Sequence, residues 1–194
     1  MKITNKILKV HAIIIVLFIT TFAFLINSSL ASDELADDKK PQQVKYSTFF
    51  DEKKHWCDAL VITCTDFRFT TATQEFINDR LELKGKYDYI SIPGSIRNLM
   101  DSKTRDLVMN TFGISLRLHH VKRVIILAHQ DCTIGYGGSK KFPELAVEYK
   151  TICQDLKKAR RLFGIKFPHL RVDLYYGTVY FNDNKRIYNF KQIL

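Results

Sequence analysis

Residues 58–64 read DALVITC, a run of apolar side chains that ends in polar ones. A short apolar run without alternation is typical of a β-strand that is buried on both faces, as in a parallel sheet. RVIILAH at 123–129 has the same character. Parallel strands need crossover connections, which are usually helices, so these two runs predict an α/β fold.

The segments around these runs alternate between helical and strand patterns. Apolar residues recur at helical spacing in three segments, and two others have the composition of strands. The predicted elements are helices over 70–85, 102–120 and 143–163, a strand at 87–94, and a strand followed by a hairpin over 169–190. We therefore predict a mainly parallel β-sheet flanked by helices, with a C-terminal antiparallel edge strand or hairpin.

Capping and turn residues predict where these elements end. Ser102 is expected to cap the second helix, and Gly85 and Gly164 are expected to end the first and third. A Gly-rich loop is expected over 133–142. The polar cluster at 182–184 is expected to form the turn of the hairpin.

The first 31 residues have the pattern of a secretory signal peptide. Three lysines precede an uncharged apolar stretch, and the small residues Ser29 and Ala31 follow it. Cleavage is expected after Ala31, and the alternative is a membrane anchor formed by residues 10–31. Both possibilities predict an exported protein, either periplasmic or secreted.

Residues 32–45 have the composition of a polar linker, which leaves 46–194 as one folded domain. The chain has 30 Lys and Arg against 20 Asp and Glu, a net charge of +10. The basic residues are scattered, and the densest stretch, KKARR at 157–161, has the pattern of a solvated helix face. We therefore expect no nucleic-acid partner, and no membrane contact beyond the possible N-terminal anchor.

Four cysteines, Cys57, Cys64, Cys132 and Cys153, leave two alternatives open. In an exported protein they could form two disulfides. A bound metal would instead hold some of them as thiolates. The sequence does not decide whether Cys57 and Cys153 are free, buried or paired with each other.

Potential metal ligands stand at the ends of two predicted strands. Cys64 ends the first strand and His129 ends the third, so both belong to the edge where such sheets bind ligands. Cys132 follows three residues after His129, close enough for both to bind one ion. Two thiolates and an imidazole suit zinc, and three protein ligands leave a fourth position open. Asp66 and Arg68 come just after Cys64, and the guanidinium can hold the carboxylate beside such an ion.

These residues resemble the two signatures of the β-class carbonic anhydrases, Cys-x-Asp-x-Arg and His-x-x-Cys. The order of the signatures and their spacing of about 65 residues also match, and LYYGTVYFNDNKRIY is similar to the family's closing strand pair. The resemblance covers approximately residues 46–194. The matching segments read Cys64-Thr65-Asp66-Phe67-Arg68 and His129-Gln130-Asp131-Cys132.

The resemblance implies a catalytic domain with one zinc ion per chain, held by Cys64, His129 and Cys132. It implies a carbonate dehydratase, a lyase that reversibly hydrates carbon dioxide to bicarbonate by a zinc-bound hydroxide, with Asp66 and Arg68 as the active-site dyad. It further implies a homodimer or a higher homo-oligomer. The amphipathic segment at 46–56 could form an arm across the partner copy.

Two departures from the family pattern leave the substrate open. Thr133 stands where the family usually has Gly, and IPGSIRN at 92–98 stands where the family commonly has Arg-Asn-Ala-Gly-Asn. One alternative is hydrolysis of another small linear substrate, carbonyl sulfide or carbon disulfide. The other is a protein that binds zinc or an anion without catalysis.

Overall fold

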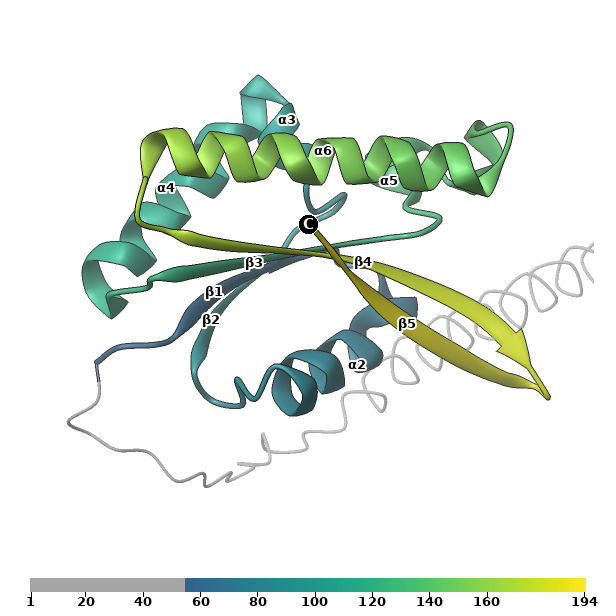
Figure 1. Cartoon of the computed structure of the whole chain (residues 1–194), viewed down its shortest axis with the longest axis horizontal. Coiled ribbons are helices and arrows are strands. Elements are labelled where there is room, and N and C mark those ends of the chain that lie inside the picture. The colour runs from purple at the N-terminus through teal and green to yellow at the C-terminus, as the bar shows by residue number, and fades with distance from the viewer. Residues whose placement is uncertain (1–54) are drawn as a thin grey trace, which may run out of the picture. The chain divides into compact units, whose positions relative to one another are not determined.

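Five strands form one sheet in the computed structural model of the protein, which describes residues 55–194 (Figure 1). Their order in the sheet is β2-β1-β3-β4-β5. The first four are parallel, and the edge strand β5 runs antiparallel to β4, as predicted. The strands are β1 (Ala59–Thr63), β2 (Tyr87–Ser91), β3 (Arg123–His129), β4 (Arg171–Asn182) and β5 (Lys185–Ile193).

Helices cover both faces of this sheet (Figure 1). One face carries α4 (Ser102–His119) and α6 (Leu145–Lys166). The other carries α2 (Phe67–Glu75), which continues into the π-helical turn η1 (Phe76–Arg80). The short helices of the described residues are α3 (Arg97–Met100), α5 (Thr133–Tyr136) and the 3-10 turn η2 (Ser139–Lys141).

The strands are apolar on both sides because each side faces a separate core. On β1, Leu60 and Ile62 belong to the core that includes residues of α4 and α6. Ala59 and Val61 belong to the second core, with Ile77 of η1. This arrangement explains the unbroken apolar runs from which the parallel sheet was predicted.

The helix predicted over 70–85 begins and ends earlier in the structure. Asp66 is its N-cap, and the Oδ1 atom of Asp66 accepts a hydrogen bond from the backbone N–H of Arg68 at 3.0 Å. The helical turns end with Leu81 as the C-cap. Gly85, with a φ of +68°, lies in the turn before β2, so the prediction that it caps the helix is wrong.

The second helix and the hairpin are confirmed, with one correction. The N-cap of α4 is Asp101, which accepts a hydrogen bond from the backbone N–H of Lys103 at 2.9 Å, and Ser102 is already the first helical residue. The hairpin turn has positive φ values at Asp183 and Asn184, +46° and +60°. Two central residues with positive φ are typical of the tight turn that joins antiparallel strands.

The third helix is confirmed but does not end at Gly164. It continues to Lys166, because Phe163 is fully buried in the core and the next turn closes by a hydrogen bond from Phe167 N–H to the Phe163 carbonyl at 2.7 Å. A glycine inside a helix costs only about 1 kcal/mol, which packing of this kind overcomes. The loop predicted over 133–142 contains the two short helices α5 and η2.

Several sequence predictions concern residues outside the part of the chain that the structure describes. These are the signal peptide or anchor at 1–31, the linker at 32–45 and most of the arm at 46–56, and they stay predictions. Between residues 55 and 194, no helix combines the length and the apolar character needed to cross a membrane.

A buried carboxylate on α6 fixes the loop that follows β3. Glu148 is 0% exposed. Its Oε1 accepts a hydrogen bond from the backbone N–H of Asp131, and its Oε2 accepts one from the hydroxyl of Ser139, both at 2.7 Å. Asp131 has a φ of +58° and accepts a further hydrogen bond from the backbone N–H of Ser139 at 2.8 Å. The loop that contains the His-x-x-Cys segment is therefore tied to α6.

We expect Glu148→Ala to lower the free energy of unfolding by about 3 kcal/mol, because two donors lose their buried acceptor. Glu148→Gln should cost much less, since its amide oxygen can still accept from Asp131 N–H and its amide group can donate to the Ser139 hydroxyl. Urea unfolding measures both. The control is Glu144→Ala, an exposed glutamate just before α6 whose side chain makes no capping bond. A Glu148→Ala protein as stable as the control would contradict the role of Glu148.

Candidate metal centre

The structure brings Cys64, His129 and Cys132 together at the carboxyl edge of the sheet. Cys64 directly follows β1, His129 is the last residue of β3, and Cys132 is the N-cap of α5. One potential ligand atom from each lies within 4.8 Å of the other two. The two sulfur atoms are 3.9 Å apart. Two thiolates on one tetrahedral zinc ion would be separated by about 3.8 Å, so the observed spacing already suits a shared ion.

His129 presents a nitrogen lone pair to this cluster. Its Nδ1 lies 2.7 Å from the carbonyl oxygen of Gln130, and because a carbonyl only accepts, Nδ1 carries the proton. Nε2 of the neutral ring therefore carries the lone pair. This atom is buried and has no hydrogen-bond partner among the described residues. A buried polar atom of this kind is costly unless a ligand satisfies it.

The surroundings of the two thiols favour ionisation of Cys64 and oppose ionisation of Cys132 unless a cation is bound. A hydrogen bond from Cys132 is the main cause that lowers the pKa of Cys64 to about 4, and His129 and the backbone N–H of Gly94, 3.3 Å from the sulfur, contribute to it. The pKa of Cys132 is raised, first by its bond to Cys64 and then by burial. A metal cation would supply the charge that lets both thiols ionise.

These residues fit a zinc ion by their chemistry. Two thiols and an imidazole nitrogen without a partner are ligands that zinc prefers, and three protein ligands leave one position for water or substrate. The bond from Nδ1 of His129 to a backbone carbonyl orients the ring, as is usual for histidines that bind metals. The ring of Phe69 packs against His129 at 4.4 Å between centroids and restricts it further.

Asp66 and Arg68 lie beside the cluster and are paired with each other. Arg68 Nε is 2.9 Å from Asp66 Oδ1, and Nη2 is 2.5 Å from Oδ2, a two-pronged contact. Asp66 Oδ2 is also 3.9 Å from Nε2 of His129. The hydrogen bonds from Arg68 hold the pKa of Asp66 below its usual value, so its carboxylate is ionised at neutral pH.

Two further residues of this region carried little or no signal in the sequence. Arg68 Nη1 donates to the Oδ2 atom of Asp131 at 2.7 Å, and Nη2 donates to the Asp131 carbonyl at 2.9 Å. The bonds from Arg68 also lower the pKa of Asp131. Asp131 stands between His129 and Cys132 in the sequence, but nothing there indicates that one arginine spans two carboxylates. Glu148 had no signal, because a glutamate in an amphipathic helix usually faces water.

The two departures from the family pattern are accommodated in the backbone. Thr133 is exposed and begins α5 without a positive φ, so this fold does not require glycine there. Glycine is required at position 135 instead, where the backbone passes close to Cys132 and Gly94. A Cβ atom there would lie 3.0 Å from the sulfur of Cys132 and 3.3 Å from Cα of Gly94. Since Gly94 belongs to IPGSIRN, the altered middle segment packs directly against the group of Cys64, His129 and Cys132.

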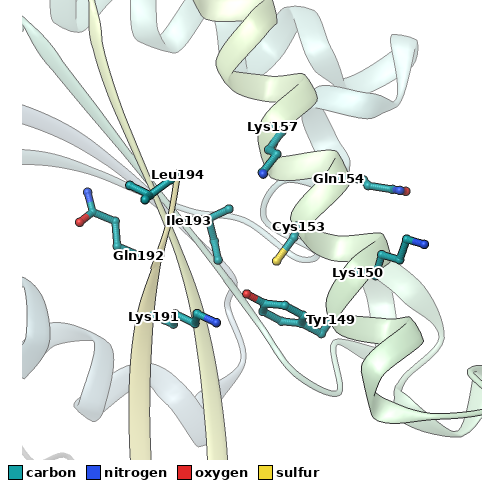
Figure 2. Close-up of a pocket in the computed structure, with 9 residues that line it drawn as sticks. All are labelled: Tyr149, Lys150, Cys153, Gln154, Lys157, Lys191, Gln192, Ile193 and Leu194. Carbon is teal, nitrogen blue, oxygen red and sulfur yellow. The ribbon is translucent and has the colours of Figure 1, made fainter.

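All four cysteines are free in the structure, so the alternative of two disulfides is wrong. Cys153 lies on α6 and borders a hollow between that helix and the C-terminal strand β5, where three lysines gather (Figure 2). Burial raises the pKa of Cys153. None of the predicted site residues lines this hollow, so it is separate from the group of Cys64, His129 and Cys132.

The sequence matches one family model and two relatives. The model, described as putative carbonic anhydrase, matches residues 54–177, which is more than half of the chain. An uncharacterized protein of Rickettsia bellii is 30% identical over 144 residues, covering 70% of this chain and 85% of the relative. An uncharacterized protein of Rickettsia conorii is 28% identical over 159 residues, covering 77% of this chain and 84% of the relative.

Solved structures of two β-carbonic anhydrases are among those that match, at low scores. The β-carbonic anhydrase CafA of Aspergillus fumigatus has a TM-score of 0.39 and 15% identity, over 89% of this chain and 88% of that one. The β-carbonic anhydrase isoform I of Trichomonas vaginalis has a TM-score of 0.36 and 13% identity, over 84% and 96%. The match of the family model to residues 54–177 is the stronger finding, and by it the chain belongs to the family of putative carbonic anhydrases.

Proposed function

We propose that the protein catalyses the zinc-dependent, reversible hydration of carbon dioxide to bicarbonate. The observation that carries this proposal is the buried Nε2 of His129, which has no hydrogen-bond partner among residues 55–194 and lies in one cluster with two thiols. Membership in the family of putative carbonic anhydrases supports it. In this proposal Cys64, His129 and Cys132 hold one zinc ion per chain.

A bound zinc ion would lower the pKa of its water from about 15.7 toward 7 and so supply hydroxide at neutral pH. In this proposal Asp66 orients the attacking oxygen. Its ionised Oδ2, 3.9 Å from Nε2 of His129, can accept a hydrogen bond from that oxygen and direct the remaining lone pair at carbon dioxide. Asp66 is therefore the proposed orienting residue of the active site.

Arg68 holds the Asp66 carboxylate by hydrogen bonds to both of its oxygens. The guanidinium contacts both Asp66 oxygens and is itself held by Asp131. The backbone carbonyl of Arg68 also accepts a hydrogen bond from the hydroxyl of Tyr188 on β5. A carboxylate fixed in this way cannot easily move onto the metal and take the place of water, which is the role proposed for Arg68.

Proposals on assembly and location accompany this function. Phe67 lies within the Cys-x-Asp-x-Arg motif, and Ile134 comes two residues after the His-x-x-Cys motif. Their side chains are 80% and 75% exposed. Exposed apolar side chains beside a site are common at interfaces, so we propose a homodimer or a higher homo-oligomer in which a second copy covers them. The pattern of residues 1–31 supports export to the periplasm or secretion, with a membrane anchor as the alternative.

One observation supports an alternative substrate. The segment at 92–98 differs from the family pattern, and its Gly94 contacts the sulfur of Cys64 and packs against Gly135. A change in direct contact with the cluster can alter which small linear molecule fits beside the metal. Hydrolysis of carbonyl sulfide or carbon disulfide is therefore the alternative activity.

Removal of the metal should abolish the activity. We expect one tightly bound zinc ion per chain, which a strong chelator removes together with carbon dioxide hydration and which added zinc restores. Metal analysis and a stopped-flow hydration assay measure both, with parallel assays on carbonyl sulfide and carbon disulfide. A zinc-loaded protein that does not hydrate carbon dioxide would refute the main proposal, and turnover of either sulfur compound would then support the alternative.

Changing Asp66 to Asn should separate metal binding from catalysis. We expect the Asp66→Asn protein to keep its zinc but to lose about a hundredfold in kcat/KM for hydration near neutral pH, because the amide carries no charge with which to orient the nucleophile. Asp79→Asn, an exposed carboxylate on η1, is the matched control and should leave both unchanged. Loss of zinc from Asp66→Asn would instead show that Asp66 is a fourth ligand and that the site is closed.

A further inference from the structure

A second group of potential metal ligands lies at the opposite edge of the sheet. Cys57 precedes β1, Asp88 is the second residue of β2, and His119 is the last residue of α4. One potential ligand atom from each lies within 4.8 Å of the other two. His119 Nδ1 is 2.8 Å from Asp88 Oδ2 and 3.0 Å from Oδ1. None of the three residues has a role in the proposed hydration.

Backbone hydrogen bonds hold these three segments together. The N–H of Cys57 donates to the carbonyl of His119 at 3.0 Å, and the N–H of Asp58 donates to the carbonyl of Lys86 at 2.7 Å. The strands β1 and β2 then pair in parallel along their whole length. The cluster is therefore built by the fold, and not by a chance approach of long side chains.

The surroundings of this cluster favour a bound cation. Burial and then the Asp88 carboxylate raise the pKa of Cys57, and a cation between the two groups would remove that repulsion. His119 stands at the C-terminal end of an 18-residue helix, where the helix dipole favours positive charge. The side chains of His119 and Asp88 are 45% and 26% exposed, so an ion and water can reach them.

We propose that Cys57, Asp88 and His119 form a second metal site, which binds Zn²⁺ or a similar late first-row divalent cation. A thiolate, an imidazole and a carboxylate are all zinc ligands, at distances of about 2.0–2.3 Å, and water completes the coordination. With one thiolate instead of two, this site binds zinc more weakly than the first. It therefore fills at a higher concentration of free zinc.

The two sites are independent of each other. Cys57 and Cys64 are seven residues apart on either side of β1, which corresponds to about 23 Å of extended chain. An ion at one site therefore does not touch the ligands of the other. The second site also does not rest on the proposed hydration activity, so each can fail without the other.

A plain ion pair between Asp88 and His119 is the competing explanation, and it would contribute little to stability at this exposure. The two explanations differ at Cys57. An ion pair leaves the Cys57 thiol equally reactive with and without zinc, whereas a metal site protects it.

Zinc stoichiometry tests the proposal on the purified full-length chain. Equilibrium dialysis against rising concentrations of free Zn²⁺ should give two ions per chain for the wild type, and one for Cys57→Ser and for Asp88→Asn. Cys153→Ser, which removes a cysteine outside both clusters, should still bind two. Zinc uptake that does not change in Cys57→Ser overturns the proposal, whatever the state of the first site.

Two further variants keep the sites apart. Cys132→Ser should lose the ion of the first cluster and keep the ion of the second. Carbon dioxide hydration should be unchanged in Cys57→Ser. A wild type with one ion that Cys57→Ser removes would support the second site and refute zinc binding at the first.

A second measurement uses the wild-type chain and does not depend on any variant folding. Each cysteine is alkylated with iodoacetamide and followed by peptide mass spectrometry with and without Zn²⁺. Alkylation of Cys57 should slow by about tenfold when free zinc is ten times the dissociation constant of this site. Alkylation of Cys153 should not change. An unchanged alkylation rate of Cys57 in millimolar Zn²⁺ would refute the metal site and leave the ion pair between Asp88 and His119 as the explanation.

Discussion

The parallel pairing of β1 with β3 is the constraint on which the cluster of Cys64, His129 and Cys132 depends. Ile62 lies opposite Ile126 in this register, so Cys64, two residues after Ile62, and His129, three residues after Ile126, reach the same edge of the sheet. Each strand is buried on two sides, and alternate residues enter two different cores. A slip of one residue would exchange the contents of the two cores and turn every side chain to the wrong face. Core packing therefore holds the thiols and the imidazole in position.

Polar side chains hold the loops that strand pairing does not fix. Arg68 joins the start of α2 to the loop after β3 by contacting Asp66 and Asp131. Glu148 joins the same loop to α6 from the other side. The three elements around the cluster are thus linked by polar side chains that are not themselves among the three potential ligands. In the second group, Cys57, Asp88 and His119, backbone hydrogen bonds from Cys57 and Asp58 hold the segments together instead.

Features with a repeating pattern could be predicted from the sequence, and features set by packing could not. Apolar runs indicated the strands, and the strand ends placed Cys64 and His129 at one edge. The predictions that glycines end helices were wrong because a glycine disfavours a helix only weakly. The helix α6 continues beyond Gly164 because Phe163 is buried in the core. Asp131 and Glu148 were missed because their partners depend on how the loop after β3 meets α2 and α6. Such contacts between a helix and a loop depend on tertiary packing, which the pattern of a single sequence does not indicate.

The donors of the first cluster are far apart along the chain, and this separation has a consequence for folding. Cys64 and Cys132 are 68 positions apart, so an unfolded chain must close a long loop before both can hold one ion. The folded chain offers them already assembled. Under the proposed zinc binding, folding and metal uptake would be linked equilibria, and each tenfold rise in free zinc above the dissociation constant would add about 1.4 kcal/mol to stability. The zinc supply of its compartment would then shift the share of the protein that is folded there.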